Sequence, residues 1–129
     1  MAENFKFELV KPDQFVFSSE VSSVKIPCYE GEMTILRDHI SLITFLRPGI
    51  VEIDKQGNLE KYYIEEGTVE FNNNSLLVLT STAEKLAEID KNKINQILAD
   101  TEKKLNDDQI SDKEKYFLTY KASTLKQLS

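Results

Sequence analysis

Ten consecutive residues, Glu30 to His39, bring together several kinds of side chain that can do chemistry. The stretch reads EGEMTILRDH and holds three carboxylates, an arginine and the only histidine of the 129 residues. Paired carboxylates can act as acid and base, and a thiolate beside an imidazole is a workable nucleophile. Because Cys28 lies two residues upstream, one hypothesis is a small hydrolase that uses Cys28 and His39.

A structural interpretation of the same residues is favoured. Free cysteine is among the most buried residue types, so we expect Cys28 to close a buried strand and His39 to cap or pack a turn. Glu30 and Glu32 are two residues apart, which places them on one face of a strand, and we expect both to be solvated. We therefore predict no catalytic residue, and the hydrolase stays as the alternative.

Metal and phosphate sites find little support in the composition. A zinc site needs about four ligands from cysteine, histidine or carboxylate side chains, and the chain has one cysteine and one histidine. A phosphate-binding loop needs clustered glycines that end in Gly-Lys-Ser or Gly-Lys-Thr, whereas the four glycines lie far apart. We predict no metal site and no cofactor.

Charge separates two regions of the chain. The formal net charge of −6 disfavours a nucleic-acid partner, because phosphate neutralisation needs clustered Lys and Arg. Residues 1–82 carry 7 basic and 13 acidic side chains, whereas residues 83–129 carry 9 of each. No apolar run approaches the roughly 18 residues of a membrane-spanning helix, and charged residues stand where a signal peptide would be apolar. We expect a soluble, cytoplasmic protein.

Residues 4–80 have the pattern of a β-rich domain. Phe5, Phe7 and Leu9 alternate with polar residues, as expected for a strand with one buried face. Further strands are predicted in QFVF, EVSSVKI, EMTIL, ISLITFL, GIVEID, LEKYYIE, GTVEF and SLLVLT, with Pro, Gly and Asn turns between them. Strands that recur about every 8 to 12 residues are typical of a sandwich or barrel. We predict an antiparallel two-sheet β-sandwich over residues 1–82.

Residues 83–129 change to a helical period and form a predicted linker and helical hairpin. Asp90 is a candidate N-cap for a first helix, whose apolar stripe is Ile94, Ile97, Leu98, Thr101 and Leu105. Ser111 and Glu114 have the spacing of a capping box before a second stripe of Leu118, Ala122, Leu125 and Leu128. Two helices joined by a short polar loop predict an antiparallel hairpin. The preceding segment AEKLAEI fits a last strand, a linker or a helical turn.

The aromatic residues divide into two groups. We expect the phenylalanines of the strands to lie in the core, namely Phe5, Phe7, Phe15, Phe17, Phe45 and Phe71. Tyrosine has an apolar body and a polar tip, and it is enriched at interfaces. The pairs Tyr62/Tyr63 and Tyr116/Tyr120 therefore predict contacts between elements.

The segment VKIPCYEGEMTILRDHISLITFLRPGIVEI resembles the signature region of the epsilon subunit of the F-type ATP synthase, called delta in mitochondria. The matching features are Pro27, Glu30-Gly31-Glu32, Ile35, His39, Leu42 to Leu46, and Pro48-Gly49. FKFELVKPDQFVFSSEVSSV and YIEEGTVEFNNNSLLVLTSTAE fit the same pattern, so the resemblance covers essentially the whole chain. Departures are Thr34 where many members have Gly, Arg37-Asp38 in place of Pro-Gly, and Glu66 in place of a second Gly.

The resemblance implies a non-catalytic rotor subunit of the central stalk. In this family the sandwich grips the gamma subunit and rests on the ring of c subunits, so that proton-driven rotation reaches the catalytic head. The implied location is peripheral, at the cytoplasmic face of an energy-transducing membrane, which we expect to be a bacterial inner membrane. Contact with that membrane would be indirect, through the c ring.

The resemblance also assigns an interface to the opening stretch. The residues that would face the c ring and gamma in one loop are Glu30, Gly31, Glu32, Arg37 and His39. Glu32 matches an acidic residue of the family that lies near the polar loops of the ring. Charge pairs there would mainly fix the register of the contact.

The family's hairpin either folds against the sandwich or extends along gamma and hinders ATP hydrolysis. Extension would bring basic residues of the second helix near an acidic loop of the beta subunits, and the candidates here are Lys113, Lys115, Lys121 and Lys126. No arginine lies beyond Arg47, so bidentate binding of carboxylates is unavailable. We expect transient contact with the alpha/beta head and weak or absent inhibition.

A nucleotide motif of some bacterial members is present only in degenerate form. The family pattern is Ile-Asp-x-x-Arg-Ala; Ile89 and Asp90 match it, but Lys93 and Ile94 replace Arg-Ala. Lysine lacks the planar fork of arginine, and Asp100, which stands where an arginine is expected, would repel phosphate. We expect no ATP binding. A free-standing adaptor with the same architecture is a further alternative, which co-purification with gamma would test.

Overall fold

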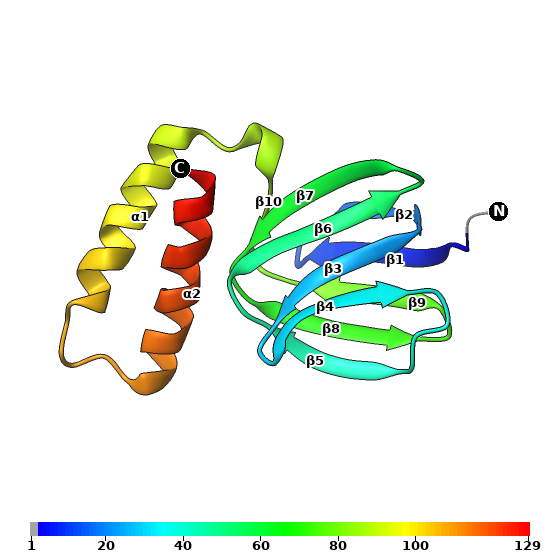
Figure 1. Cartoon of the computed structure of the whole chain (residues 1–129), viewed down its shortest axis with the longest axis horizontal. Helices are drawn as coiled ribbons and strands as arrows, with labels where there is room; N and C mark the ends of the chain where they lie inside the picture. The colour runs from blue at the N-terminus through cyan, green and yellow to red at the C-terminus, as the bar shows by residue number, and fades with distance from the viewer. Residues whose placement is uncertain (1–2) are drawn as a thin grey trace.

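The computed structural model describes residues 3–129 as a β-rich domain followed by two helices (Figure 1). Within these residues the strands are β1 (Phe5–Lys11), β2 (Gln14–Val21), β3 (Ser23–Cys28), β4 (Gly31–Leu36), β5 (Leu42–Leu46), β6 (Gly49–Lys55), β7 (Asn58–Ile64), β8 (Gly67–Asn72), β9 (Ser75–Leu79) and β10 (Ala83–Lys85). A 3₁₀ turn, η1 (Leu86–Glu88), leads to α1 (Lys91–Leu105) and α2 (Asp112–Leu128). The predicted β-sandwich with a C-terminal helical hairpin is confirmed.

The strands form one mixed sheet in the order β10-β7-β6-β3-β5-β8-β9-β1-β2, with β4 paired to β3 outside this path. The sheet curls over itself into a nearly closed, barrel-like sandwich (Figure 1). Among the pairs described, β1 and β9 run parallel, and the others are antiparallel, as predicted. The parallel pair joins strands from opposite ends of the domain, which local turn signals do not encode.

Two tight hairpins have the turn residues that their geometry requires. Gln56 and Gly57 join β6 to β7 with φ of 53° and 92°, and Asn73 and Asn74 join β8 to β9 with φ of 51° and 56°. Two successive residues with positive φ match the twist of the flanking strands, and Asn and Gly adopt this conformation most readily. These turns fix the register of both hairpins.

The core lies between the two layers of the curled sheet. Phe5, Phe7 and Leu9 of β1 are buried, as their alternation predicts. The prediction that Phe15 and Phe45 lie in the core is wrong, because their side chains are 67% and 57% exposed. The predicted strands QFVF and EVSSVKI also divide differently: β2 continues to Val21, and β3 begins at Ser23.

Two glycines of the sequence pattern have a packing role. A Cβ on Gly49 would lie 2.5 Å from Cβ of Pro27, which is buried in β3. A Cβ on Gly67 would collide with the carbonyl oxygen of Leu79. Only glycine permits these close approaches. The Pro27 and Gly49 features of the sequence therefore mark a close approach of β3 and β6.

The helices begin where the sequence predicts. A carboxylate oxygen of Asp90 accepts a hydrogen bond from the Asn92 amide at 2.9 Å, and the Ser111 hydroxyl oxygen accepts one from the Glu114 amide at 3.1 Å. The ambiguous segment AEKLAEI forms both β10, which pairs with β7, and the turn η1. No helix in residues 3–129 combines the length and apolar character needed to cross a membrane.

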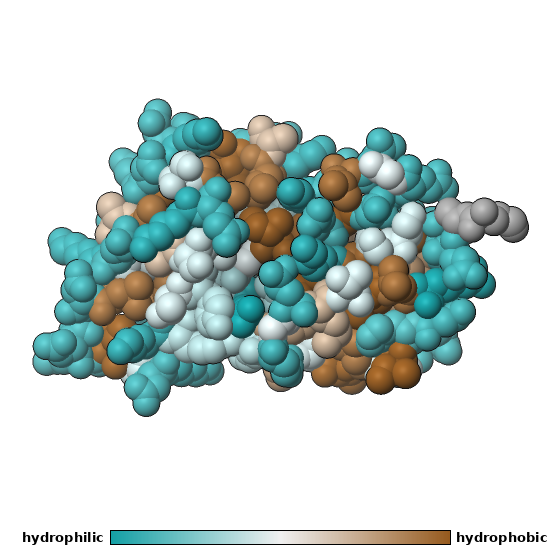
Figure 2. All heavy atoms as spheres, in the orientation of Figure 1, coloured by the Kyte–Doolittle hydropathy of each residue, from teal (hydrophilic) through white to brown (hydrophobic). Residues whose placement is uncertain are grey.

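The hairpin packs against the sandwich through α2, which lies between α1 and the strands (Figure 1). A small apolar cluster forms there, with Tyr63, Ile94 and Leu125 buried at its centre. Figure 2 shows hydrophilic side chains over most of the outline of the molecule, with apolar patches between the hairpin and the sandwich and along the lower edge of the sandwich.

Candidate functional site

The stretch from Glu30 to His39 forms a strand with two separate ends. Residues 31–36 form β4, which runs away from the hairpin in Figure 1 and spans roughly 17 Å at the usual rise per residue. Glu30 and Gly31 therefore lie at the start of β4, whereas Arg37 and His39 follow its other end. The expectation of one loop surface is therefore wrong for the folded chain.

Glu30 lies in the two-residue turn between β3 and β4. Gly31 follows it with φ of 132°, a conformation that side-chain-bearing residues rarely adopt. The Thr44 hydroxyl of β5 donates to the Glu30 carboxylate at 3.1 Å, and the Tyr29 amide donates to the carbonyl oxygen of Phe45 at 3.1 Å. The turn is thus bonded to β5. The expectation that Glu30 and Glu32 share one strand face is wrong, because Glu30 lies in the turn and only Glu32 lies in β4.

Glu32 lies on β4 in a group of charges. Lys25 Nζ lies 3.7 Å from the Glu32 carboxylate and 3.6 Å from the Glu52 carboxylate. The Glu32 side chain is 65% exposed, so this ion pair is weak. Its carboxylate is therefore accessible to a basic group of another molecule.

The opposite end of β4 is fastened to the β8–β9 turn. The Asp38 amide donates to Asn74 Oδ1 at 2.6 Å, and Asn74 Nδ2 donates to Asp38 Oδ1 at 2.9 Å. The His39 ring packs edge-on against Phe71 at 5.8 Å between centroids. Arg37 Nε lies 4.0 Å from Asp38 Oδ1. His39 packs a turn, as the structural interpretation predicts, beside the exposed Ile40.

Cys28 and His39 are not brought together. Cys28 is buried and pairs with Leu46 at one end of β5, whereas His39 precedes the other end of that strand. Burial, together with the nearby charge of Glu30, raises the pKa of the Cys28 thiol to about 11. A thiol with this pKa is almost entirely protonated at neutral pH. The hydrolase alternative therefore loses its geometric and its chemical basis.

An exposed apolar face, which sequence reasoning missed, lies on the outside of β5, β8 and β9. Ile43, Phe45 and Leu79, here called the outer apolar face, are 78%, 57% and 46% exposed. Thr68 of β8 pairs with both Phe45 and Leu79, so the three strands present these residues together. The sequence signal was available in ISLITFL, where alternate positions on both faces are apolar.

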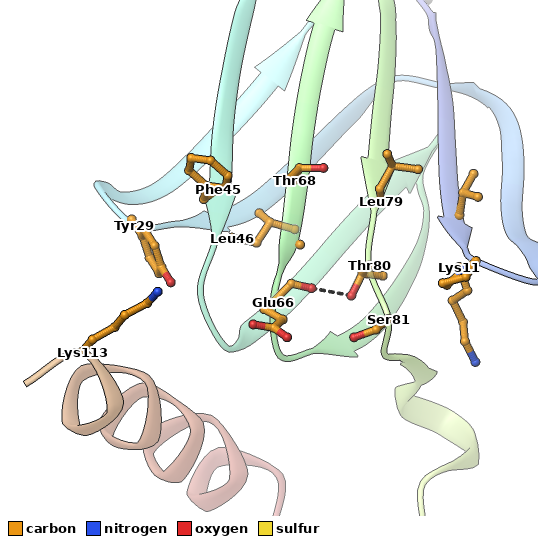
Figure 3. A pocket seen from close by; sticks show the side chains of 13 residues that line it. Lys11, Tyr29, Phe45, Leu46, Glu66, Thr68, Leu79, Thr80, Ser81 and Lys113 are labelled. Atoms are coloured by element: carbon orange, nitrogen blue, oxygen red, sulfur yellow. Dashed lines mark hydrogen bonds between the residues drawn. The ribbon is translucent and has the colours of Figure 1, made fainter. Parts of the chain in front are cut away.

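A groove of about 820 Å³ continues from this face toward α2. Figure 3 shows Phe45, Thr68 and Leu79 on adjacent strands and Lys113 on the first turn of α2, with its ammonium near Tyr29. The Thr80 hydroxyl donates to the carbonyl oxygen of Glu66, and both residues line the groove. The lining surface is mainly apolar with several polar groups among it, which suits contact with another macromolecule.

α2 contacts the sandwich through polar and aromatic groups one helical turn apart. The Tyr116 hydroxyl donates to the Tyr29 carbonyl oxygen at 2.9 Å. The Arg47 guanidinium lies 3.9 Å from the ring centroid of Tyr120. The Thr124 hydroxyl lies 3.4 Å from the carbonyl oxygen of Pro48. The predicted contacts of Tyr116 and Tyr120 are therefore found within the chain.

The four candidate lysines of the second helix differ in their surroundings. Lys113, Lys115 and Lys126 are exposed. Lys121 lies 3.4 Å from the Glu65 carboxylate, and the Tyr63 hydroxyl donates to the same oxygen at 3.1 Å. Burial is the largest cause, and the Glu65 charge the next, of a raised pKa at Tyr63. Lys121 is therefore engaged inside the chain while the hairpin is docked.

The degenerate nucleotide motif has structural roles. Asp90 caps α1, as described above, and Ile89 packs against the apolar cluster under the hairpin. Lys93 Nζ lies 3.8 Å from the Glu84 carboxylate. The hollow beside these residues, about 340 Å³, is lined by three acidic side chains, of Glu84, Glu88 and Asp90, against two lysines, so its charge is unfavourable for phosphate. Across residues 3–129, no group of three or more His, Cys, Asp or Glu side chains is placed to hold a metal ion.

Comparisons of the sequence with known proteins all point to one family. Residues 4–86 match the family described as ATP synthase, Delta/Epsilon chain, beta-sandwich domain. The ATP synthase epsilon chain of Pelagibacter ubique is 44% identical over 130 residues, covering 100% of both chains. That of Parvibaculum lavamentivorans is 33% identical, covering 99% of this chain and 97% of the relative.

Solved structures show the same fold. A chain in the cryo-EM structure of the Euglena gracilis mitochondrial ATP synthase, OSCP/F1/c-ring in rotational state 1, aligns with a TM-score of 0.79 at 24% identity, covering 99% of this chain and 81% of that one. A chain in the central stalk/c-ring structure of the Tetrahymena thermophila mitochondrial ATP synthase aligns with a TM-score of 0.66 at 16% identity, covering 98% and 95%. With a family match over most of its length and relatives matched from end to end, the chain belongs to the delta/epsilon subunit family of ATP synthases.

Proposed function

We propose that this chain is a non-catalytic rotor subunit of an F-type ATP synthase. It binds gamma and the c ring in the central stalk and helps couple proton-driven rotation to ATP synthesis. The observation that carries the proposal is the outer apolar face, because a neighbouring subunit of the assembled enzyme would cover it. The absence of an assembled Cys28/His39 pair also favours binding over catalysis.

Gamma covers the outer apolar face in this proposal. Large exposed apolar groups on adjacent strands are typical of protein–protein contacts, and their burial supplies most of the affinity of such an interface. The connection between β4 and β5 leads into this face and extends the contact through Arg37 and His39. Its polar groups set the register against gamma.

The double variant Ile43→Asp/Phe45→Asp tests this contact. Both side chains point to solvent in the free chain, so the variant should fold normally by circular dichroism. We expect binding to purified gamma to weaken at least about 30-fold, the loss typical of a central interface residue. Leu59→Asp is the control, because Leu59 is 56% exposed on β7, away from this face. Unchanged gamma binding by the double variant would refute the proposal.

The hairpin end of β4 faces the c ring in this proposal. Glu30, Gly31 and Glu32 form the contact, and the exposed carboxylate of Glu32 meets basic side chains of the ring. Because rim charges mainly affect register and association rate, Glu32→Gln should slow reassembly with enzyme lacking this subunit by a few-fold at low salt. The difference should shrink at high salt. An equal difference at both salt concentrations would exclude this role.

The hairpin inhibits ATP hydrolysis weakly or not at all. Lys113, Lys115 and Lys126 are available for transient contact with acidic groups of the alpha/beta head, but Lys121 would first have to leave Glu65. Deleting residues 90–129 should therefore change hydrolysis by the assembled enzyme by less than about threefold, which is below 1 kcal/mol of differential contact. A many-fold rise would overturn this part of the proposal.

The location and ligand requirements follow from the same assignment. The subunit lies at the cytoplasmic face of an energy-transducing membrane, a bacterial inner membrane, and reaches it only through the c ring. It needs no cofactor, and Ile89, Asp90 and Lys93 do not bind ATP, because Asp90 caps α1 and Lys93 lies beside Glu84. Tight ATP binding by the isolated chain in calorimetry would contradict this statement.

A further inference from the structure

The β3–β4 turn is held from two sides. On the β5 side, the Tyr29 amide of the turn donates to the Phe45 carbonyl oxygen, and the Glu30 carboxylate accepts from the Thr44 hydroxyl. From α2 it receives the Tyr116 hydroxyl, which donates to the Tyr29 carbonyl oxygen across 87 positions of sequence. The Tyr29 and Tyr116 rings also meet edge-on, with centroids 5.4 Å apart and planes at 83°. One side of the turn therefore depends on the hairpin.

The contacts around this turn form a closed circuit. The Tyr116 ring packs against Tyr120 at 4.8 Å between centroids, and Tyr120 carries the Arg47 guanidinium on its face. Arg47 directly follows β5, and its amide donates to the Pro27 carbonyl oxygen at 3.0 Å, next to Cys28 at the start of the turn. Each contact in the circuit is supported by the next, so loss of one loosens its neighbours.

We infer that Tyr116 is a positioning residue: through its contacts with Tyr29, the docked hairpin sets the geometry of the β3–β4 turn and of the Glu30 carboxylate. The two elements are then energetically linked. A partner that binds the turn in its present geometry favours the docked hairpin, and undocking of the hairpin weakens that binding by the same factor. The consequence for c-ring binding rests on the function proposed above; the positioning itself does not.

Hydrogen exchange by NMR on the full chain tests the positioning. Tyr116→Phe removes the hydroxyl but keeps the ring, so we expect the Tyr29 amide to exchange about fivefold faster, as for the loss of one net hydrogen bond. Tyr116→Ala also removes the ring contact and should accelerate exchange at least tenfold. The amides of the Gln56–Gly57 turn, which is remote from α2, should be unchanged.

Thr119→Ala is the matched control on the helix, because Thr119 is exposed and its hydroxyl bonds to Lys115 within α2. It should leave exchange at Tyr29 as in the parent chain. If Tyr116→Ala changes exchange at Tyr29 by less than twofold, the inference is wrong. It is also wrong if Tyr116→Phe accelerates exchange throughout α2 as much as at Tyr29, because the hydroxyl would then hold only the helix.

The linkage to a partner has a separate readout. Tyr116→Ala should bind enzyme that lacks this subunit at least threefold more weakly than the parent chain, and Tyr116→Phe should recover part of that loss. Normal binding by a variant whose turn exchanges faster would overturn the linkage. Such a result would leave the proposed rotor function standing, since that function is tested by the Ile43 and Phe45 variants.

Discussion

The sandwich and the docked hairpin are held together by different kinds of contact. The sandwich encloses a continuous apolar cluster that includes fully buried phenylalanines and branched aliphatic side chains from both layers. The hairpin adds a much smaller cluster, centred on Tyr63, Ile94 and Leu125, and directional contacts of Tyr116 and Tyr120. The first kind of contact scales with buried apolar area, whereas the second depends on the alignment of individual groups.

This difference indicates two levels of stability within one chain. A small, partly polar contact between regions resembles a transient interface, and regions with few buried apolar contacts open at lower free energy than the core. The hairpin should therefore leave the sandwich without unfolding it. Changes in the core should affect the whole chain, while changes under the hairpin should affect the helices alone.

The largest effect is expected from Phe71→Ala. Phe71 is buried in β8 and packs edge-on against Phe5 at 5.8 Å between centroids. Removing such a ring from a core costs about 3–5 kcal/mol, so urea denaturation followed by circular dichroism should show this loss for the complete chain. A loss below about 1 kcal/mol would mean that the core tolerates cavities and that its packing does not dominate stability.

Leu125→Ala should have the next largest effect, but a local one. Leu125 is 1% exposed at the centre of the hairpin cluster, and this truncation removes about 2–4 kcal/mol of packing. We expect amides of α1 and α2 to lose protection in hydrogen exchange, while the strands keep theirs. Gln127→Ala, on the exposed side of α2, is the control. Equal loss of protection in strands and helices would show a single cooperative unit.

The sequence predicts the elements of both regions well because their signals are local. Alternation in β1, the cap residues Asp90 and Ser111, and the turn at Asn73-Asn74 each depend on neighbours in the chain. Pairing between distant strands is not local, so the parallel contact of β1 with β9 was not predictable from these patterns.

The candidate site was harder to predict for the same reason. The stretch EMTIL already indicates a strand, and this strand separates Glu30 from His39 in space. In β5 both faces carry apolar residues, so periodicity cannot show that Phe45 points outward while Leu46 is buried. The contact of Tyr116 with Tyr29 joins residues 87 positions apart, which a single sequence does not encode locally.

Alkaline pH distinguishes two adjacent tyrosines that face different regions. Tyr62 packs in the sandwich core and Tyr63 in the hairpin cluster, and burial together with a nearby glutamate raises the pKa of each. Besides Glu65, the charged groups near Tyr63 are Glu84 of β10 and Lys121 of α2. An unfolded tyrosine loses its proton near pH 10, while the folded one keeps it.

The sign of the pH dependence follows from this difference. Stability from the protonated tyrosines is complete below about pH 10 and falls above it, by up to about 1.4 kcal/mol per pH unit for each group. Tyr63→Phe should make hairpin protection less sensitive to pH between about 10 and 11.5, whereas Tyr62→Phe should affect mainly the strands. The same alkaline loss of helix protection in Tyr63→Phe and the parent chain would exclude Tyr63 as its source.

The smallest effect is expected from Lys121→Met, which tests whether a charge pair contributes to docking. Lys121 and Glu65 have side chains 17% and 24% exposed, so solvent screens them only in part, and we expect a loss of about 1 kcal/mol. Helix amides should exchange about fivefold faster, and their exchange should depend less on salt than in the parent chain. Lys126→Met, at an exposed position of α2, removes the same charge without this partner. If both variants behave alike, net charge rather than the Glu65 contact sets the docking strength. The polar contacts that stabilise docking would then be those of Tyr116, Tyr120 and Thr124 alone.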